Sequence, residues 1–381
     1  MNTNIHINVN SDVLVWARES LAMSRNNASE KTKISPKRLI QLESGKQPTL
    51  VELKALSKAY KRTIATLLLN NPPLEKPLPS DRRTVDSKDL GVFHEKSIMS
   101  VRKARALAQS YVELRQEIGL GLTKLNHFAS VHDNPQFIGA QIRRLLKLDE
   151  IREISNINFA LDAYIERVES LGIAVFQLSL KQDKLRGFSI VDDIIPIIGI
   201  KRGGEQVHSK TFTLFHELGH ILLNEGGLCD FSTKTTLEIE KWCNAFSAEI
   251  LIPADELLKM EIVINNQQIG QKIWSKKDLV ELANYFHVGP LALLRKLLDL
   301  NLTTQAFYNE KHLAWNKPQF GRAKEPKGRE LHKESFSERG RTFVSLAFKA
   351  FDQNRINIKD LSDFLGLKLS YIPKTRQLLN A

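Results

Sequence analysis

The spacing of apolar residues predicts a series of short helices between residues 11 and 71. From Asp12 onward, apolar residues recur three or four positions apart, as they do along one face of a helix. Pro36 suits the first turn of a helix, Gly45 suits its end, and Thr49 can cap the next helix. A tight turn before Pro36 is typical of helix-turn-helix units, so this region is predicted to form an all-helical bundle of that kind.

The pattern changes after this bundle. Residues 72–96 are rich in proline and poor in large apolar residues, which predicts a linker. Helical spacing returns and lasts to Gly172. Two β-rich runs follow, Ile173–Leu180 and Phe188–Ile200, and we expect them to pair as a hairpin. Pro196 indicates that the second run is an edge strand or is interrupted.

One predicted helix, TFTLFHELGHILL, carries polar residues inside an apolar surface. Thr211 or Thr213 can cap it, and its polar triplet is His216, Glu217 and His220. Positions i and i+4 share a helical face, so both imidazoles can point at one metal ion, with the carboxylate beside a bound water. The alternative is a chance match in a core helix, where uncompensated polar groups cost about 1–3 kcal/mol each.

A second helical segment supplies further candidates downstream. Ile239, Trp242 and Phe246 fall on one face of this segment. Glu240 stands one turn before Asn244, so an acidic ligand and an orienting amide can face the same metal. This E-x-x-x-[DN] arrangement after H-E-x-x-H resembles that of zincins whose third ligand is a glutamate.

These paired motifs, FTLFHELGHILL and EKWCNAFSAEILIP, resemble the ImmA/IrrE family of metallo-endopeptidases over roughly residues 150–300. The resemblance implies one Zn²⁺ per chain, and its proposed ligands are His216, His220 and Glu240. It also implies that Glu217 is the catalytic base and that Asn244 orients a ligand. The chain departs from the family pattern at Cys243, where a small residue is usual, and at Trp242, where an acidic one is usual.

The family resemblance carries an expected mechanism. Zinc would polarise the scissile carbonyl and activate water, and Glu217 would accept the proton and deliver it to the leaving amine. An edge strand beside the metal helix would hold the substrate in extended form. Candidates for a further oxyanion donor are Tyr308, His312 and His332. The expected substrate is a regulatory protein, often a repressor, that controls stress genes or a mobile element.

The first bundle resembles the XRE family of helix-turn-helix domains through VWARESLAMS, ISPKRLIQLESGKQPT and LKALSKAYKR. In that family the third helix enters the major groove. The matching DNA-contact residues would be Ser35, Lys37, Arg38, Gln41 and Lys46, with Lys31 as a further phosphate contact. Lys, Arg and Gln can bind guanine or adenine edges. The alternative is a helical dimerisation or docking bundle with a basic face.

Together these features predict an α+β protein. Residues 97–300 are expected to form a zincin-like domain with a small sheet, and residues 301–381 a basic helical C-terminal region. Within the latter, Asn309–Ser335 is polar and is predicted to be a loop. Two helices would follow it, and their apolar face would pack on the body of the protein, on a partner or on a second copy, which leaves a homodimer open.

Charge and cysteine content narrow the function further. The net charge is +12, and basic residues outnumber acidic ones at both ends. This suggests an anionic partner such as DNA, but a soluble lysine-rich surface explains the charge equally well. Two cysteines, Cys229 and Cys243, form no disulfide framework, and their spacing is unusual for a zinc knuckle. No apolar signal or membrane segment is evident, so a cytoplasmic protein without a membrane partner is expected.

Three functions remain open from the sequence. The first is a zinc endopeptidase fused to a DNA-binding domain, and the presence of Glu217 favours it. The second is a transcriptional regulator whose zincin domain acts as a sensor or interaction module with little proteolysis. The third is the regulatory half of a toxin–antitoxin-like pair.

Overall fold

The computed structural model describes residues 6–75, 95–181, 185–191, 194–224, 233–270, 272–315 and 330–380. The chain divides into two compact units, Met1–Arg102 and Lys103–Ala381. Most of the predicted linker lies outside the described residues, as do Cys229 and the turn residues 182–184.

The first unit contains the predicted bundle. Its helices are α1 (Ser11–Glu19), α2 (Arg25–Thr32), α3 (Pro36–Glu43), α4 (Leu50–Tyr60) and α5 (Ile64–Leu67). The side chains of Ser24, Ser35 and Thr49 cap α2, α3 and α4 by accepting hydrogen bonds from backbone N–H groups. Arg18 and Glu43 form a buried ion pair of 2.6 Å that ties α1 to the end of α3. The expected helix-turn-helix arrangement is therefore confirmed.

The remaining elements are mostly helical. Helices α6 to α10 and the 3₁₀ helix η1 are α6 (Glu95–Glu117), α7 (Pro135–Leu145), η1 (Leu148–Glu153), α8 (Ile157–Glu169), α9 (Val207–Leu222) and α10 (Thr233–Leu251). Those after them are α11 (Ala254–Leu257), α12 (Glu261–Gln268), α13 (Lys276–Tyr285), α14 (Pro290–Asp299), α15 (Gln305–Trp315), α16 (Leu331–Asp352), α17 (Ile358–Leu365), η2 (Leu369–Tyr371) and α18 (Ile372–Leu379). The α+β prediction is confirmed by these helices and one small sheet.

The sheet has the strand order β1-β3-β2, with β1 (Ala174–Leu178), β2 (Gly187–Ile190) and β3 (Ile197–Lys201). Strand β1 pairs in parallel with β3, and β2 pairs antiparallel with β3. The two β-rich runs were predicted to pair as a hairpin, and this prediction is wrong. Strand β1 of the first run does not pair with β2, because β3 lies between them. Pro196 interrupts the second run just before β3, since it has no N–H to donate to a ladder.

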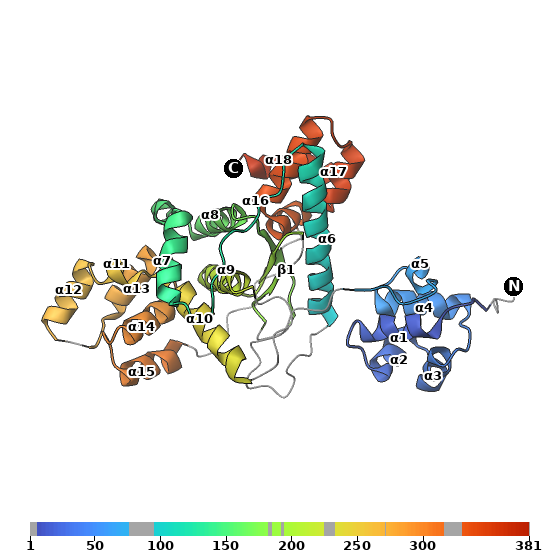
Figure 1. The fold of residues 1–381 in the computed structure, drawn as a ribbon, viewed down its shortest axis with the longest axis horizontal. Helices are drawn as coiled ribbons and strands as arrows, with labels where there is room; N and C mark the ends of the chain where they lie inside the picture. Colours follow the sequence, from blue (N-terminus) through green and yellow to red (C-terminus); the bar gives the residue numbers. More distant parts are fainter. Residues whose placement is uncertain are drawn as a thin grey trace. The chain divides into compact units, whose positions relative to one another are not determined.

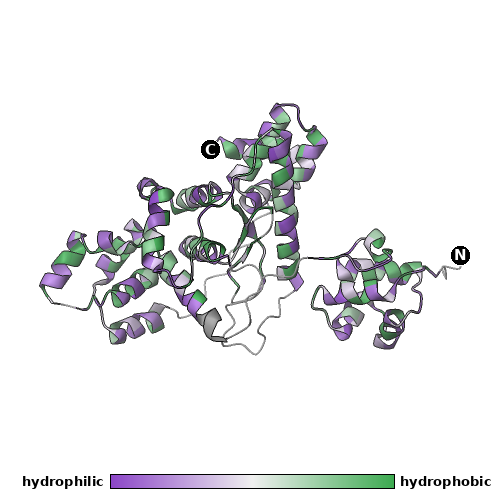
Figure 2. Cartoon of the chain, viewed as in Figure 1, coloured by the Kyte–Doolittle hydropathy of each residue, from purple (hydrophilic) through white to green (hydrophobic). Residues whose placement is uncertain are grey.

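Helices cover both faces of this sheet (Figure 1). Helix α9 packs on β2 and β3, and α16 packs on β1. All residues of β1 are buried in consequence: Val175 joins the core around α9, whereas Phe176 meets Phe343 of α16 with ring centroids 6.5 Å apart. In Figure 2 the strands are mainly apolar, while polar and apolar residues interleave along most helices. Because helices cover both faces of the sheet, the sheet gives α9 a rigid surface to pack on.

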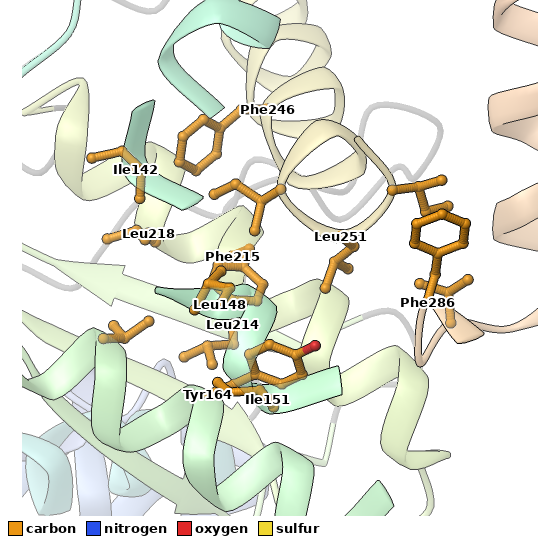
Figure 3. Close-up of a cluster of buried hydrophobic side chains, with 14 of the residues drawn as sticks. Ile142, Leu148, Ile151, Tyr164, Leu214, Phe215, Leu218, Phe246, Leu251 and Phe286 are labelled. Carbon is orange, nitrogen blue, oxygen red and sulfur yellow. The ribbon is translucent and has the colours of Figure 1, made fainter. Parts of the chain in front are cut away.

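A large apolar core lies around α9 (Figure 3). Phe215 of α9 meets Tyr164 of α8 edge to face, with centroids 5.5 Å apart, and Leu218 and Phe246 extend the core toward α10. Full burial of each such side chain contributes about 1.5–3 kcal/mol to folding. The apolar face of α9 thereby sets where its polar residues point.

The C-terminal region differs from the prediction in two places. Helix α15 fills Gln305–Trp315, so the loop predicted over residues 309–335 is wrong at its start, and α16 replaces its end from Leu331 onward. Helix α15 lacks a clear apolar pattern in the sequence because Phe307 is its one buried residue. Helices α16 to α18 pack on the body of the protein through contacts of α16 with β1 and α8.

Candidate metal centre

Helix α9 holds His216, Glu217 and His220 in the interior, with exposed fractions of 3%, 3% and 6%. The helix begins at Val207, earlier than the expected caps, and the Thr211 hydroxyl donates to the Val207 carbonyl inside the first turns. The i and i+4 spacing brings the two imidazole centroids to 4.9 Å.

Helix α10 brings Glu240 to the same point. The Nε2 atoms of His216 and His220 lie 3.2 Å apart. Each is also 3.2 Å from a carboxylate oxygen of Glu240, His216 from Oε2 and His220 from Oε1. These are the residues in the described chain whose ligand atoms gather closely enough to hold a metal ion.

The donor set fits zinc. Ligand atoms about 2.0–2.2 Å from a tetrahedral zinc ion are separated by about 3.4 Å, close to the spacing seen here. In addition, Glu240 Oε1 is buried and has no hydrogen-bond partner. A cation among the three side chains would satisfy that oxygen.

Electrostatics keep the Glu240 carboxylate ionised. Burial by itself raises its pKa, but the neighbouring imidazoles of His216 and His220 outweigh burial, so the pKa lies well below its ordinary value. An ionised carboxylate is the form that coordinates metals.

Asn244, one turn after Glu240, contacts the first histidine. Its Oδ1 lies 3.1 Å from Nδ1 of His216. An Nδ1–H that donates to this amide oxygen leaves the lone pair of Nε2 directed at Glu240 and His220. The structure thus brings together all of the metal-site residues that the sequence indicated.

Gly187, at the start of β2, was missed by sequence reasoning. A Cβ atom there would lie 3.1 Å from Oε1 of Glu217 and 2.5 Å from Cγ2 of Thr213. Only glycine lets this strand approach the carboxylate so closely. In the sequence, Gly187 simply ends a polar turn, so nothing there indicates its contact with helix α9. Because β2 follows β3 at the end of the strand order, an edge strand passes beside Glu217.

Two protein families match parts of the chain. Residues 168–298 match the Peptidase M78 family, described as the IrrE N-terminal-like domain. Residues 14–67 match a helix-turn-helix family. The chain fuses a DNA-binding helix-turn-helix domain to an IrrE-like domain. A search of curated proteins finds no match for the chain.

The two departures from the IrrE-like pattern are accommodated by packing. Cys243 is fully buried against Gly219, where an added Cβ would lie 3.1 Å from its sulfur, so the glycine makes room for it between α9 and α10. Trp242 donates from Nε1 to the Asp133 carbonyl at 2.8 Å and stacks on Phe246. Neither side chain belongs to the group that can hold a metal.

The predicted DNA-contact residues fall into two kinds. Lys37 and Lys46 are exposed, and Gln41 is half-buried. Ser35 caps α3, and Arg38 is held by Glu52, with Nε to Oε1 at 2.7 Å and Nη2 to Oε2 at 2.9 Å. Arg38 therefore has a structural partner within the domain.

The residues predicted as candidate oxyanion donors lie on α15 and α16. Tyr308 and His312 pack against each other on α15, and His332 stacks on Tyr371. None of the helices in the described ranges combines the length and apolar character of a membrane span.

Proposed function

We propose that the chain is a zinc-dependent endopeptidase that its helix-turn-helix domain directs to DNA. The observation that supports this most strongly is the convergence of His216, His220 and Glu240 with 3.2 Å between ligand atoms. One zinc ion per chain would bind there, and it would supply Lewis acidity that activates water and polarises a carbonyl.

Glu217 is the proposed base. It directly follows the first proposed ligand, and its Oε1 faces the backbone of the edge strand at Gly187. From this position the carboxylate can take a proton from the attacking water and pass it to the leaving amine. A substrate strand that pairs with the open side of β2 would bring its scissile bond to Glu217.

The DNA-binding domain suggests the class of substrate. A peptidase held on DNA meets repressors at high local concentration, so we propose a repressor-type protein in stress or mobile-element control as the substrate. Lys37, Gln41 and Lys46 are the proposed contacts with DNA from the exposed side of α3 and its following turn. Ser35 would contribute at the start of α3, and Arg38 could reach a base only by leaving Glu52.

Mapping of new protein N-termini tests this function. Cells of one host strain express the wild-type chain or the Glu217→Gln variant at equal levels, and N-termini are compared by mass spectrometry. We expect cleavage sites that appear with the wild type alone, while both purified proteins bind zinc equally. Identical N-termini from two zinc-loaded proteins would instead support a regulator whose IrrE-like domain acts as a sensor.

A further inference from the structure

A cavity lies in the Lys103–Ala381 unit. It has a volume of about 300 Å³ and is lined by parts of α8, β1, the first turn of α9, α16 and Leu378 of α18. This volume is at the small end for ligand pockets. Its described lining contains none of the three proposed zinc ligands.

Several charges at this cavity already have partners. The Arg341 guanidinium donates to the Leu379 carbonyl at 2.6 Å and lies 3.6 Å from Glu166. Lys333 lies 3.0 Å from Glu330. These groups hold α16, α18 and α8 in place, and they largely offset one another.

Asp162 and Lys210 differ from those groups. Within the described part of the chain, Asp162 makes no hydrogen bond or ion pair, although it lines the cavity. Lys210 donates one hydrogen bond, to Oε1 of Gln177 at 3.1 Å, and its ammonium has two further N–H groups. Burial raises the pKa of Asp162 and lowers that of Lys210, so both charges lack the solvation that water would give them.

The rest of the wall is largely apolar, with Asn158 and Ser337 as its other polar residues. Phe159 is 55% exposed at the cavity, and Phe336, Leu161 and Leu378 complete this part. An apolar wall beside one acid and one base that are not paired with each other is complementary to a small molecule with both charges and a hydrocarbon side chain.

We propose that this cavity binds a zwitterionic α-amino acid or dipeptide with an apolar side chain. Asp162 accepts hydrogen bonds from the ligand's ammonium, and Lys210 donates to its carboxylate. Phe159 and Phe336 cover the side chain. Lys210 lies six residues before His216 on α9, about 9 Å along the helix axis, so the two sites share one helix without sharing residues.

Isothermal titration of the full chain tests the site. The probes are L-phenylalanine, L-leucine and L-leucyl-L-leucine, with 3-phenylpropanoate and phenethylamine as analogues that lack one charge. We expect at least one zwitterion to bind, and its one-charge analogue to bind at least about tenfold more weakly, because a charged hydrogen bond is lost. An analogue that binds as well as the zwitterion, or no binding by any zwitterion, would overturn the proposal.

Variants locate the binding. Asp162→Asn and Lys210→Gln should each weaken the zwitterion by about tenfold or more. Lys374→Gln, exposed on α18 and outside the cavity lining, should leave affinity unchanged. Phe159→Ala, at a half-exposed position that folding tolerates, should also weaken it. Circular dichroism confirms that each variant is folded. Unchanged affinity in Asp162→Asn, Lys210→Gln and Phe159→Ala alike would place any binding elsewhere and contradict the assignment.

Discussion

At the residue scale, Asn244 is the proposed support of one proposed metal ligand. Its Oδ1 lies 3.1 Å from His216 Nδ1, and a hydrogen bond there would fix the direction of Nε2. We expect Asn244→Ala to lower zinc affinity about 10–100-fold, as loss of such supporting contacts does elsewhere. Competition with a zinc chelator measures this. Glu238→Gln, exposed on the same helix, is the control, and equal affinities in both variants would contradict the orienting role.

The buried carboxyl of Glu169 leads to a second prediction, about how stability depends on pH. Burial, opposed by a hydrogen bond from the Thr342 hydroxyl and assisted by nearby Glu166, raises its pKa to about 8 from 4.5. The folded state therefore keeps a proton that the unfolded state releases. This contribution to stability is complete below pH ~4.5 and is lost as pH rises through about 8.

The Glu169→Gln variant removes this titration. The unfolding free energy of the wild type should fall between pH 5 and pH 8.5. In Glu169→Gln this fall should be smaller by about 1–3 kcal/mol, as measured by urea denaturation. Glu153→Gln, at an exposed position, should keep the wild-type pH profile. A Glu169→Gln profile that parallels the wild type would show that the carboxyl is ionised in the folded state.

Spacing in the sequence indicated which residues of the proposed metal site lie close together, because their geometry is local to two helices. His216 and His220 share a face of one helix, and Glu240 and Asn244 share a face of the other. Contacts between distant elements were not predictable in this way. Gly187 approaches Glu217 across 30 residues, and Arg38, whose type suits guanine, is engaged by Glu52 after the next turn.

At the element scale, the position of β2 beside α9 depends on Gly187. In Gly187→Ala the new Cβ would meet Thr213 Cγ2 at 2.5 Å and the Gly199 carbonyl oxygen at 2.9 Å, so the strand or the helix must shift. We expect a loss of about 1–3 kcal/mol in unfolding free energy and a larger loss of proteolysis than of zinc binding. Gly203→Ala, where a Cβ meets no atom within 4 Å, is the control. Unchanged proteolysis in Gly187→Ala would refute the placement of substrate at β2.

Helix α3 yields a prediction that separates stability from DNA binding. The Arg38 hydrogen bond lowers the pKa of Glu52 to about 2, and Glu52 also completes the capping box of α4. Arg38→Ala should therefore cost about 1–2 kcal/mol of stability. Lys37→Ala should leave stability unchanged but weaken binding to duplex DNA and reduce its salt slope by about 1. Fluorescence anisotropy across a salt series measures this, and an unchanged slope would exclude Lys37 as a phosphate contact.

Elements with strong periodicity were predictable, and those set by tertiary pairing were not. The helices of the first unit follow caps and glycine or proline signals in the sequence, such as Thr49 and Pro36. The strand order depended on partners that an apolar run does not specify, because β1 and β2 both pair with β3. Helix α15 was missed because its buried face is narrow.

At the scale of the whole molecule, the fusion places a DNA-binding unit and an IrrE-like domain in one chain. Each unit has its own core and its own proposed site. The proposed peptidase activity depends on the metal centre, whereas DNA binding depends on the first unit. Loss of zinc should therefore abolish proteolysis and leave affinity for duplex DNA unchanged.

Metal content of the purified full-length protein tests the central claim most directly. Elemental mass spectrometry should find about one zinc per chain in the wild type and in Glu217→Gln, since Glu217 is not a proposed ligand. The Glu240→Gln and His216→Ala variants should lose it after dialysis. A folded wild-type chain that binds no zinc when the ion is supplied would contradict the metallopeptidase account.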